Sequence, residues 1–160
     1  MSLRTTIAAV IAIGALAPAS AHAATNQTVL GVATGKATVN TATLELSAEQ
    51  KVLMSHVGAG TVTFSAQASR ADGIVRAIGP FTIVASSGDK ITGVGTLVGV
   101  GPTLNVHPVG FIMTITGGTG RFANASGTLV TAPLVTPITP FTPPLLFERL
   151  ESAVHGYISY

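Results

Sequence analysis

The chain has 160 residues, which is room for one domain with or without a targeting segment. Only 9% of the residues are charged and 47% are hydrophobic, so the composition excludes intrinsic disorder as the main state. The net charge of +2 is too small for a nucleic-acid-binding or anionic-membrane surface, and we expect neither partner. Because the chain has no cysteine, disulfides and thiolate chemistry are also excluded.

Residues 1–23 have the pattern of a secretory signal peptide. Arg4 precedes an apolar run over residues 7–16, Pro18 follows it, and Ala21-His22-Ala23 matches the small-x-small cleavage site. The run is shorter than the roughly 20 residues that a membrane-spanning helix needs. An uncleaved anchor or a buried N-terminal helix is the alternative. We predict cleavage after Ala23 and export of residues 24–160 to the periplasm or the extracellular space.

The rest of the sequence is typical of β-strands joined by tight turns. Over residues 58–68, small or apolar residues at even positions alternate with polar ones, which is the period of a strand with one solvated face. Asp72-Gly73, Ser87-Gly88-Asp89 and Gly101-Pro102 predict turns. Glycines on one face of residues 91–100 indicate bends or close approach of another strand. The expected strands cover residues 28–39, 41–46, 58–68, 74–84, 91–100, 109–116, 128–132 and 154–160.

Two segments allow more than one interpretation. Ser47 and Gln50 fit a helix capping box within residues 47–57, but Val52 and Val57 continue smoothly into the next strand, which favours a strand. Five prolines make residues 132–146 a long extended loop or edge, which either crosses the surface or covers the barrel mouth as a flap. Seven to nine short strands without a long helix predict an all-β barrel or sandwich.

Residues 116–127 resemble the G-G-T-G-R-F-x-x-A-x-G signature of the allene oxide cyclase/dirigent barrel superfamily. Residues 55–58 and 87–93 are similar to two weaker motifs of its uncharacterised bacterial exported members. The resemblance implies a calycin-like antiparallel β-barrel of about eight strands, with a glycine turn and a phenylalanine tucked under the barrel. Eight strands leave space for a filled core or one small ligand. The residues that carry this structural motif are Gly117, Gly118, Gly120, Arg121, Phe122 and Gly127.

Family members include plant cyclases of fatty epoxides, dirigent proteins that steer radical coupling, and bacterial biosynthetic cyclases. The sparse charges of this chain match no catalytic set of these proteins, so the resemblance implies a ligand-sized lumen and leaves the catalytic residues unknown.

Strand periodicity selects candidate residues for that lumen. The face of residues 58–68 that carries the apolar side chains includes His56 if the alternation continues through Gly58, and His107 shares parity with a later apolar face. A sparse polar group in an apolar concavity is typical of a ligand pocket, although a histidine on such a face is more often a hydrogen-bonded structural residue. The predicted lumen residues are His56, Val62, Phe64, Ala66, His107, Phe111 and Met113.

The other ionisable residues predict no second site. The three histidines of residues 24–160 are at positions 56, 107 and 155 and could converge on zinc, but independent histidines at strand ends explain them better. Asp72 and Asp89 fit turns. The pairs Glu45/Glu49 and Glu148/Glu151 are expected on a solvated rim rather than in an acid–base site. We expect no metal and no cofactor.

These observations favour a secreted small β-barrel that binds a small apolar molecule or serves structurally. A cofactor-free cyclase or isomerase is the alternative, because catalysis by confinement in a lumen needs few ionisable groups. A small outer-membrane barrel is a second alternative, which the absence of tryptophan and the presence of only two tyrosines disfavour. A role in surface adhesion is the third alternative. An open lumen favours a ligand or catalysis, a filled lumen a structural role, and an outward apolar band a membrane.

Overall fold

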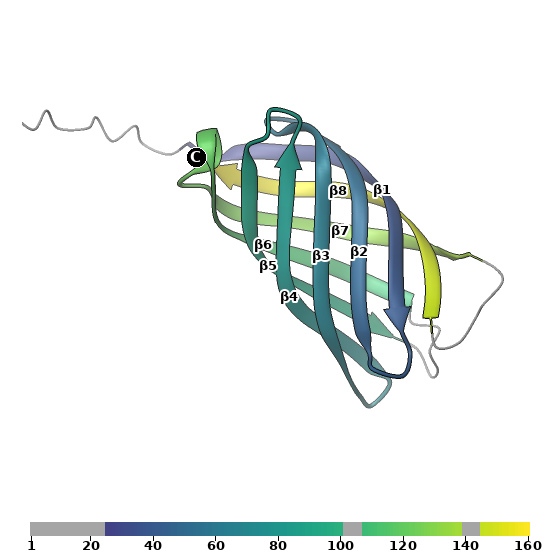
Figure 1. Ribbon diagram of the computed structural model, residues 1–160. Helices are drawn as coiled ribbons and strands as arrows, with labels where there is room; N and C mark the ends of the chain where they lie inside the picture. The colour runs from purple at the N-terminus through teal and green to yellow at the C-terminus, as the bar shows by residue number, and fades with distance from the viewer. Residues whose placement is uncertain (1–24, 101–106, 139–144) are drawn as a thin grey trace, which may run out of the picture.

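The computed structural model describes residues 25–100, 107–138 and 145–160. Within these ranges the strands are β1 (Gln27–Asn40), β2 (Glu45–Met54), β3 (Gly58–Ala71), β4 (Ile74–Ala85), β5 (Lys90–Val100), β6 (His107–Gly118), β7 (Ser126–Pro137) and β8 (Leu145–Ser159), with a short 3-10 helix, η1 (Gly120–Phe122), before β7. Each strand pairs antiparallel with the next and β8 pairs with β1, which closes the barrel seen in Figure 1. The predicted all-β barrel of about eight strands is confirmed.

Strand alternation separates the two faces of the barrel wall. On β3, Val62 and Phe64 are buried in the interior while Thr63 between them is exposed, as the sequence predicts. On β4, Ile83 faces the core and Ile78 is exposed on the outside, so this strand is apolar on both faces. No helix among the described residues has the length and apolar character to cross a membrane.

The interior is densely filled at the end of the barrel that holds η1 and the C-terminus (Figure 1). The Phe122 ring is fully buried there, packs edge-on against Tyr160 with ring centroids 5.0 Å apart, and lies 4.5 Å from the Arg121 guanidinium. The expectation that this phenylalanine is buried is confirmed. Among the described residues, the largest fully buried side chains are Val29, Val57, Phe81, Ile83, Ile91, Phe122, Leu129 and Ile158.

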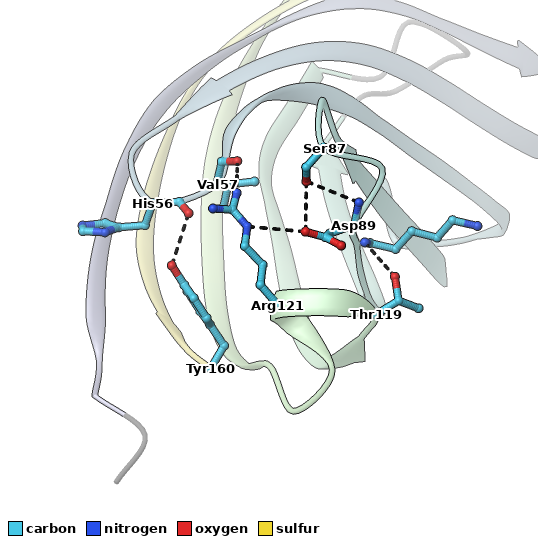
Figure 2. Close-up of polar contacts among 8 residues, drawn as sticks. His56, Val57, Ser87, Asp89, Thr119, Arg121 and Tyr160 are labelled. Atoms are coloured by element: carbon cyan, nitrogen blue, oxygen red, sulfur yellow. Dashed lines mark hydrogen bonds and ion pairs between the residues drawn. The ribbon is translucent and has the colours of Figure 1, made fainter. Parts of the chain in front are cut away.

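Polar contacts connect η1 to the neighbouring turns, as Figure 2 shows. Arg121 Nη2 donates a hydrogen bond of 2.7 Å to the Val57 carbonyl oxygen, and Arg121 Nε lies 3.8 Å from the Asp89 carboxylate. The Lys90 amide donates to Thr119 Oγ1 over 3.0 Å. The glycine-rich motif therefore closes one end of the barrel by packing and by hydrogen bonds to turns from two other hairpins.

The turns differ in part from the prediction. Residues 41–44 form a turn instead of a strand, and Leu44 adopts a positive φ of 59° there. A helix was the alternative for residues 47–57, but residues 47–54 belong to β2 and residues 55–57 form a turn that leads into β3. Asp72 and Asp89 lie in turns as predicted. The predicted turn at Gly101-Pro102 lies outside the described residues.

The proline-rich residues 132–146 were predicted to form a long extended loop or edge, and strands β7 and β8 extend into this segment from both sides. Strand β7 continues through Pro133 to Pro137, and β8 begins at Leu145. Pairing between β6 and β7 ends at Phe111 and Thr131, and β7 then pairs only with β8. A proline fits such a position because it lacks the N–H that a second neighbour would need. Residues 139–144, on which the flap and crossover alternatives depend, lie outside the described residues.

Candidate functional site

The barrel is hollow in the half that lies away from η1. A cavity of about 90 Å³ is lined by inward-facing residues of all eight strands. One water molecule needs roughly 10–15 Å³ of such cavity volume, so the cavity has room for several waters or a small organic group. Ser69 and Arg70, both exposed near the end of β3, line its outer edge.

Small side chains create this space. Ala37 on β1, Ala48 on β2 and Ala68 on β3 all line the cavity, and Ala37 pairs in register with Ala48. In the filled half, interior positions carry larger side chains such as Ile83 and Ile91. The short side chains of Ala37, Ala48 and Ala68 therefore leave part of this half of the interior unfilled.

An aromatic pair forms one wall of the cavity. The rings of Phe64 and Phe111 lie 4.7 Å apart between centroids, with their planes tilted by 56°, which is a favourable arrangement for aromatic side chains. Gly95 on β5 makes room for both rings. A Cβ at this position would lie 2.6 Å from Phe111 and 2.8 Å from Phe64.

Four polar side chains face this otherwise apolar cavity. Their exposed fractions are 9% for Gln50, 4% for Thr131, 8% for Glu148 and 8% for Ser152. Gln50 Nε2 and Ser152 Oγ have no hydrogen-bond partner within the described part of the chain. An unsatisfied buried polar group costs about 1–3 kcal/mol, so such groups call for a specific explanation.

Glu148 brings a titratable group to the cavity. Burial raises the pKa of its carboxyl from the ordinary 4.5 to about 6, because the ionised form loses its hydration. At neutral pH the carboxyl is ionised, so a buried negative charge faces the cavity. A carboxyl with a raised pKa in a concave site is typical of functional positions.

Strand register places Gln50 and Glu148 on the two strands that flank β1. Glu148 pairs with Ala37 of β1, and Gln50 of β2 pairs with Gly35, which in turn pairs with Leu150. Two strand spacings, about 10 Å, therefore separate the backbones of Gln50 and Leu150. Gly35 allows the backbone of β2 to approach closely, because a Cβ at this position would collide with the Glu49 carbonyl oxygen and the Gln50 Cα.

The structure brings together three of the predicted lumen residues. Val62, Phe64 and Phe111 line the cavity. Met113 is buried in the core and Ala66 is half-buried against it, and neither lines the cavity.

The predicted inward position of His56 is wrong. His56 lies in the turn between β2 and β3 with a φ of 63°, its side chain is exposed, and in Figure 2 it points away from the barrel. The alternation of faces was extended through residues that do not belong to a strand. The backbone carbonyl of His56 accepts a hydrogen bond of 3.3 Å from the Tyr160 hydroxyl. His107 begins β6, and its side chain lies outside the described part of the structure.

The four glutamates were expected on a solvated rim, and three of them are exposed. Glu45 and Glu49 are exposed, and Glu151 forms an ion pair of 2.8 Å with Arg149 on the outer surface. Glu148 is the exception, because positions 148 and 151 have opposite parity on β8 and therefore lie on opposite faces. Among the described residues, no group of three His, Asp or Glu side chains is placed to hold a metal ion.

Sequence reasoning missed Gln50, Thr131, Glu148 and Ser152 as site residues. A signal for two of them was present, since Glu148 and Ser152 share parity with Val154 and Ile158, which a strand places on the core side. The strand was expected to start only at residue 154, so this parity was not followed back.

No protein-family model, no curated protein and no solved structure matches this chain. The class of protein is therefore defined by geometry: a closed eight-stranded antiparallel β-barrel, filled at one end and hollow at the other.

Proposed function

We propose that this protein binds a small, mainly apolar molecule in the hollow half of its barrel. The observation that carries the proposal is the unequal filling of the interior, with large buried side chains at one end and alanines around a cavity at the other. A barrel with a purely structural role is more stable when side chains fill both ends of its interior. At about 24 cal/mol per Å³, a dry cavity of 90 Å³ costs on the order of 2 kcal/mol.

The distribution of apolar residues favours a ligand in the lumen over a membrane-spanning barrel. Membrane barrels place apolar residues toward lipid and polar residues toward the lumen. Here the lumen is mainly apolar, and the outer surface is mixed. It carries Lys51, Glu49, Thr63 and Ser65 on β2 and β3, and exposed apolar side chains such as Leu30 and Val32 on β1 and Ile78 on β4. Export to the periplasm or the extracellular space remains part of the proposal, and the pattern of residues 1–23 supports it.

The lumen proposal is tested with toluene as an apolar probe. The dissociation constant is measured by ligand-observed NMR for the wild type, for Ala37→Leu and for Ala153→Leu. Ala37 lines the cavity, whereas Ala153 is exposed on β8 and serves as a matched control. We expect toluene binding to be lost in Ala37→Leu and retained in Ala153→Leu. Equal affinities in all three proteins would contradict a lumen site.

The natural occupant is sought by native mass spectrometry of the protein purified from its own host. A retained small molecule in the wild type, absent from Ala37→Leu, is the expected result. A natural occupant retained equally by both proteins would place that molecule outside the cavity.

Acid–base catalysis in the same lumen is a second candidate function, and the buried Glu148 carboxyl is the observation that favours it. A carboxylate with a pKa near 6 is suited to remove a proton from carbon next to a carbonyl group. Deuterium incorporation into the α-carbons of cyclohexanone in D₂O tests this chemistry. We expect the wild type to accelerate the exchange and Glu148→Gln not to; equal rates for both proteins would contradict it.

A further inference from the structure

We propose that the polar groups in the lumen recognise a hydroxyl group, so that the occupant is a small, otherwise apolar alcohol. This inference rests on the proposed binding function and names the chemical class of its ligand. It is carried by two buried side chains that face the cavity without partners among the described residues, Gln50 and Ser152, together with the buried Glu148 carboxyl that lines the same cavity.

The first step concerns hydrogen-bond donors. Gln50 and Ser152 are more than nine-tenths buried, and the Gln50 amide nitrogen and the Ser152 hydroxyl have no partner among the described residues. Both atoms can donate a hydrogen bond, and the amide nitrogen of glutamine can only donate. The ligand group that completes the site therefore offers lone pairs.

The second step concerns the acceptor. The buried Glu148 carboxylate accepts hydrogen bonds only. The ligand group must also carry a donor. A hydroxyl has one O–H donor and two lone pairs, so it can donate to Glu148 while it accepts from Gln50.

Other polar groups match the cluster less well. An ammonium group has donors but no lone pair, so Gln50 Nε2 stays unsatisfied. A ligand carboxylate is repelled by the like charge of Glu148. A ketone accepts from Gln50 but donates nothing. Arg70, at the outer edge of the cavity, is the other charged residue among the described residues that line it, whereas Arg149 and Glu151 of β8 pair on the outside.

The apolar part of the ligand follows from the remaining lining. The Phe64 and Phe111 rings, with Val62 and Leu150, offer a surface for an aromatic or alicyclic body. Because the cavity measures only about 90 Å³, we expect this body to be about the size of one six-membered ring.

The test compares four probes of one shape: toluene, benzyl alcohol, benzylamine and benzoate. Dissociation constants are measured at pH 7.5 for the full chain as wild type, Gln50→Leu, Glu148→Gln and Glu151→Gln. We expect benzyl alcohol to bind the wild type at least about fivefold more tightly than toluene, which is the effect of one net hydrogen bond. This preference is expected to vanish in Gln50→Leu, to shrink in Glu148→Gln and to persist in the outward-facing control Glu151→Gln.

The outcomes separate this inference from the function on which it rests. Equal binding of toluene and benzyl alcohol overturns hydroxyl recognition but leaves the apolar lumen site in place. Tightest binding of benzylamine or benzoate assigns the site to another ligand class and overturns the inference. If none of the four probes binds, the lumen function fails as well. The ranking of the four dissociation constants on the wild type decides whether the lumen recognises a hydroxyl group, even where a variant does not fold.

Discussion

Phe122 and Tyr160 pack with their ring planes 74° apart, so that the last residue of the chain covers the phenylalanine of the glycine-rich motif. Phe122 is fully buried, and Tyr160 also donates a hydrogen bond to the carbonyl oxygen of His56 in the turn between β2 and β3. Three segments far apart in the sequence therefore meet at the filled end of the barrel. The stability of the barrel should depend on this contact more than on the hollow end.

The first prediction concerns Phe122. We expect Phe122→Ala to lower the free energy of unfolding by about 3–5 kcal/mol, because it removes a fully buried ring and leaves a cavity. Tyr160→Phe keeps the ring contact and removes one hydrogen bond of 3.3 Å, so it should cost only about 0.5–1.5 kcal/mol. Urea titration of the three proteins measures both values. Similar losses in the two variants would show that the hydrogen bond, and not the ring, dominates.

The second prediction concerns Gly120. Its φ of 57° is unfavourable for a β-branched residue, and a Cβ would also collide with the Asp89 carboxylate. We expect Gly120→Val to cost at least about 1–3 kcal/mol. Gly110→Val is the control, because the nearest atom to a Cβ there is 4.0 Å away and its φ is not positive. Equal midpoints of thermal unfolding for the two variants would contradict the role of Gly120.

The third prediction follows from the buried Glu148. Its carboxyl has a pKa of about 6 in the folded state and an ordinary value of 4.5, so the folded protein binds more protons between these values. Its contribution to stability is therefore complete below pH 4.5 and is lost as the pH rises to about 6 and above. A difference of 1.5 units in pKa corresponds to about 2 kcal/mol.

Glu148→Gln removes this titration. The variant should be more stable than the wild type by up to about 2 kcal/mol at pH 7.5 and similar to it at pH 4. Glu151→Gln on the outer face provides the control, since it should show no such dependence on pH. Urea titrations at both pH values make the comparison. A wild type that is less stable than Glu148→Gln at pH 4 and equal to it at pH 7.5 would reverse the sign and refute this account.

The sequence predicts the barrel wall well because each hairpin carries its own local signals. Asp72-Gly73 and Ser87-Gly88-Asp89 are turn sequences, and the alternation over residues 58–68 identifies the core face of β3. The glycine at position 93 was expected at a bend, and the structure has a register shift between Thr92 and Gly93. These features depend on residues close in sequence.

The site could be predicted only in part because it depends on register between distant strands. Val62, Phe64 and Phe111 were found from alternation, whereas the meeting of Gln50 with Glu148 requires the pairing of β1 with both β2 and β8. The pairing of β1 with β8, which closes the barrel, cannot be predicted from the sequence of either strand alone.

The fourth prediction concerns export. We expect N-terminal sequencing of the protein recovered outside the cytoplasm to begin at Ala24, because Ala21 and Ala23 fit the peptidase pocket. The first strand begins at Gln27, so this cleavage would leave the barrel intact. Ala23→Asp should block the cleavage, whereas Ala24→Ser should not. Exported wild-type protein that still begins with Met1 would contradict the prediction.

The last prediction compares two glycines on the inner face of β5. A Cβ at Gly93 would collide with the backbone carbonyl oxygen of Thr114, which cannot move without breaking the pairing of β5 with β6. The three atoms nearest to a Cβ at Gly95 are outer atoms of the Phe64 and Phe111 rings, which can shift toward the cavity.

Overpacking typically lowers the free energy of unfolding by roughly 1–3 kcal/mol. We expect the loss for Gly93→Ala to reach or exceed the upper end of this range, and the loss for Gly95→Ala to lie near the lower end. Gly95→Ala should also weaken toluene binding by about tenfold, which is about 1.4 kcal/mol, because the displaced rings occupy space that the ligand needs. Urea titration and ligand-observed NMR on the two variants test both parts. A Gly95→Ala protein that binds toluene as tightly as the wild type would show that the aromatic pair does not bound the ligand site.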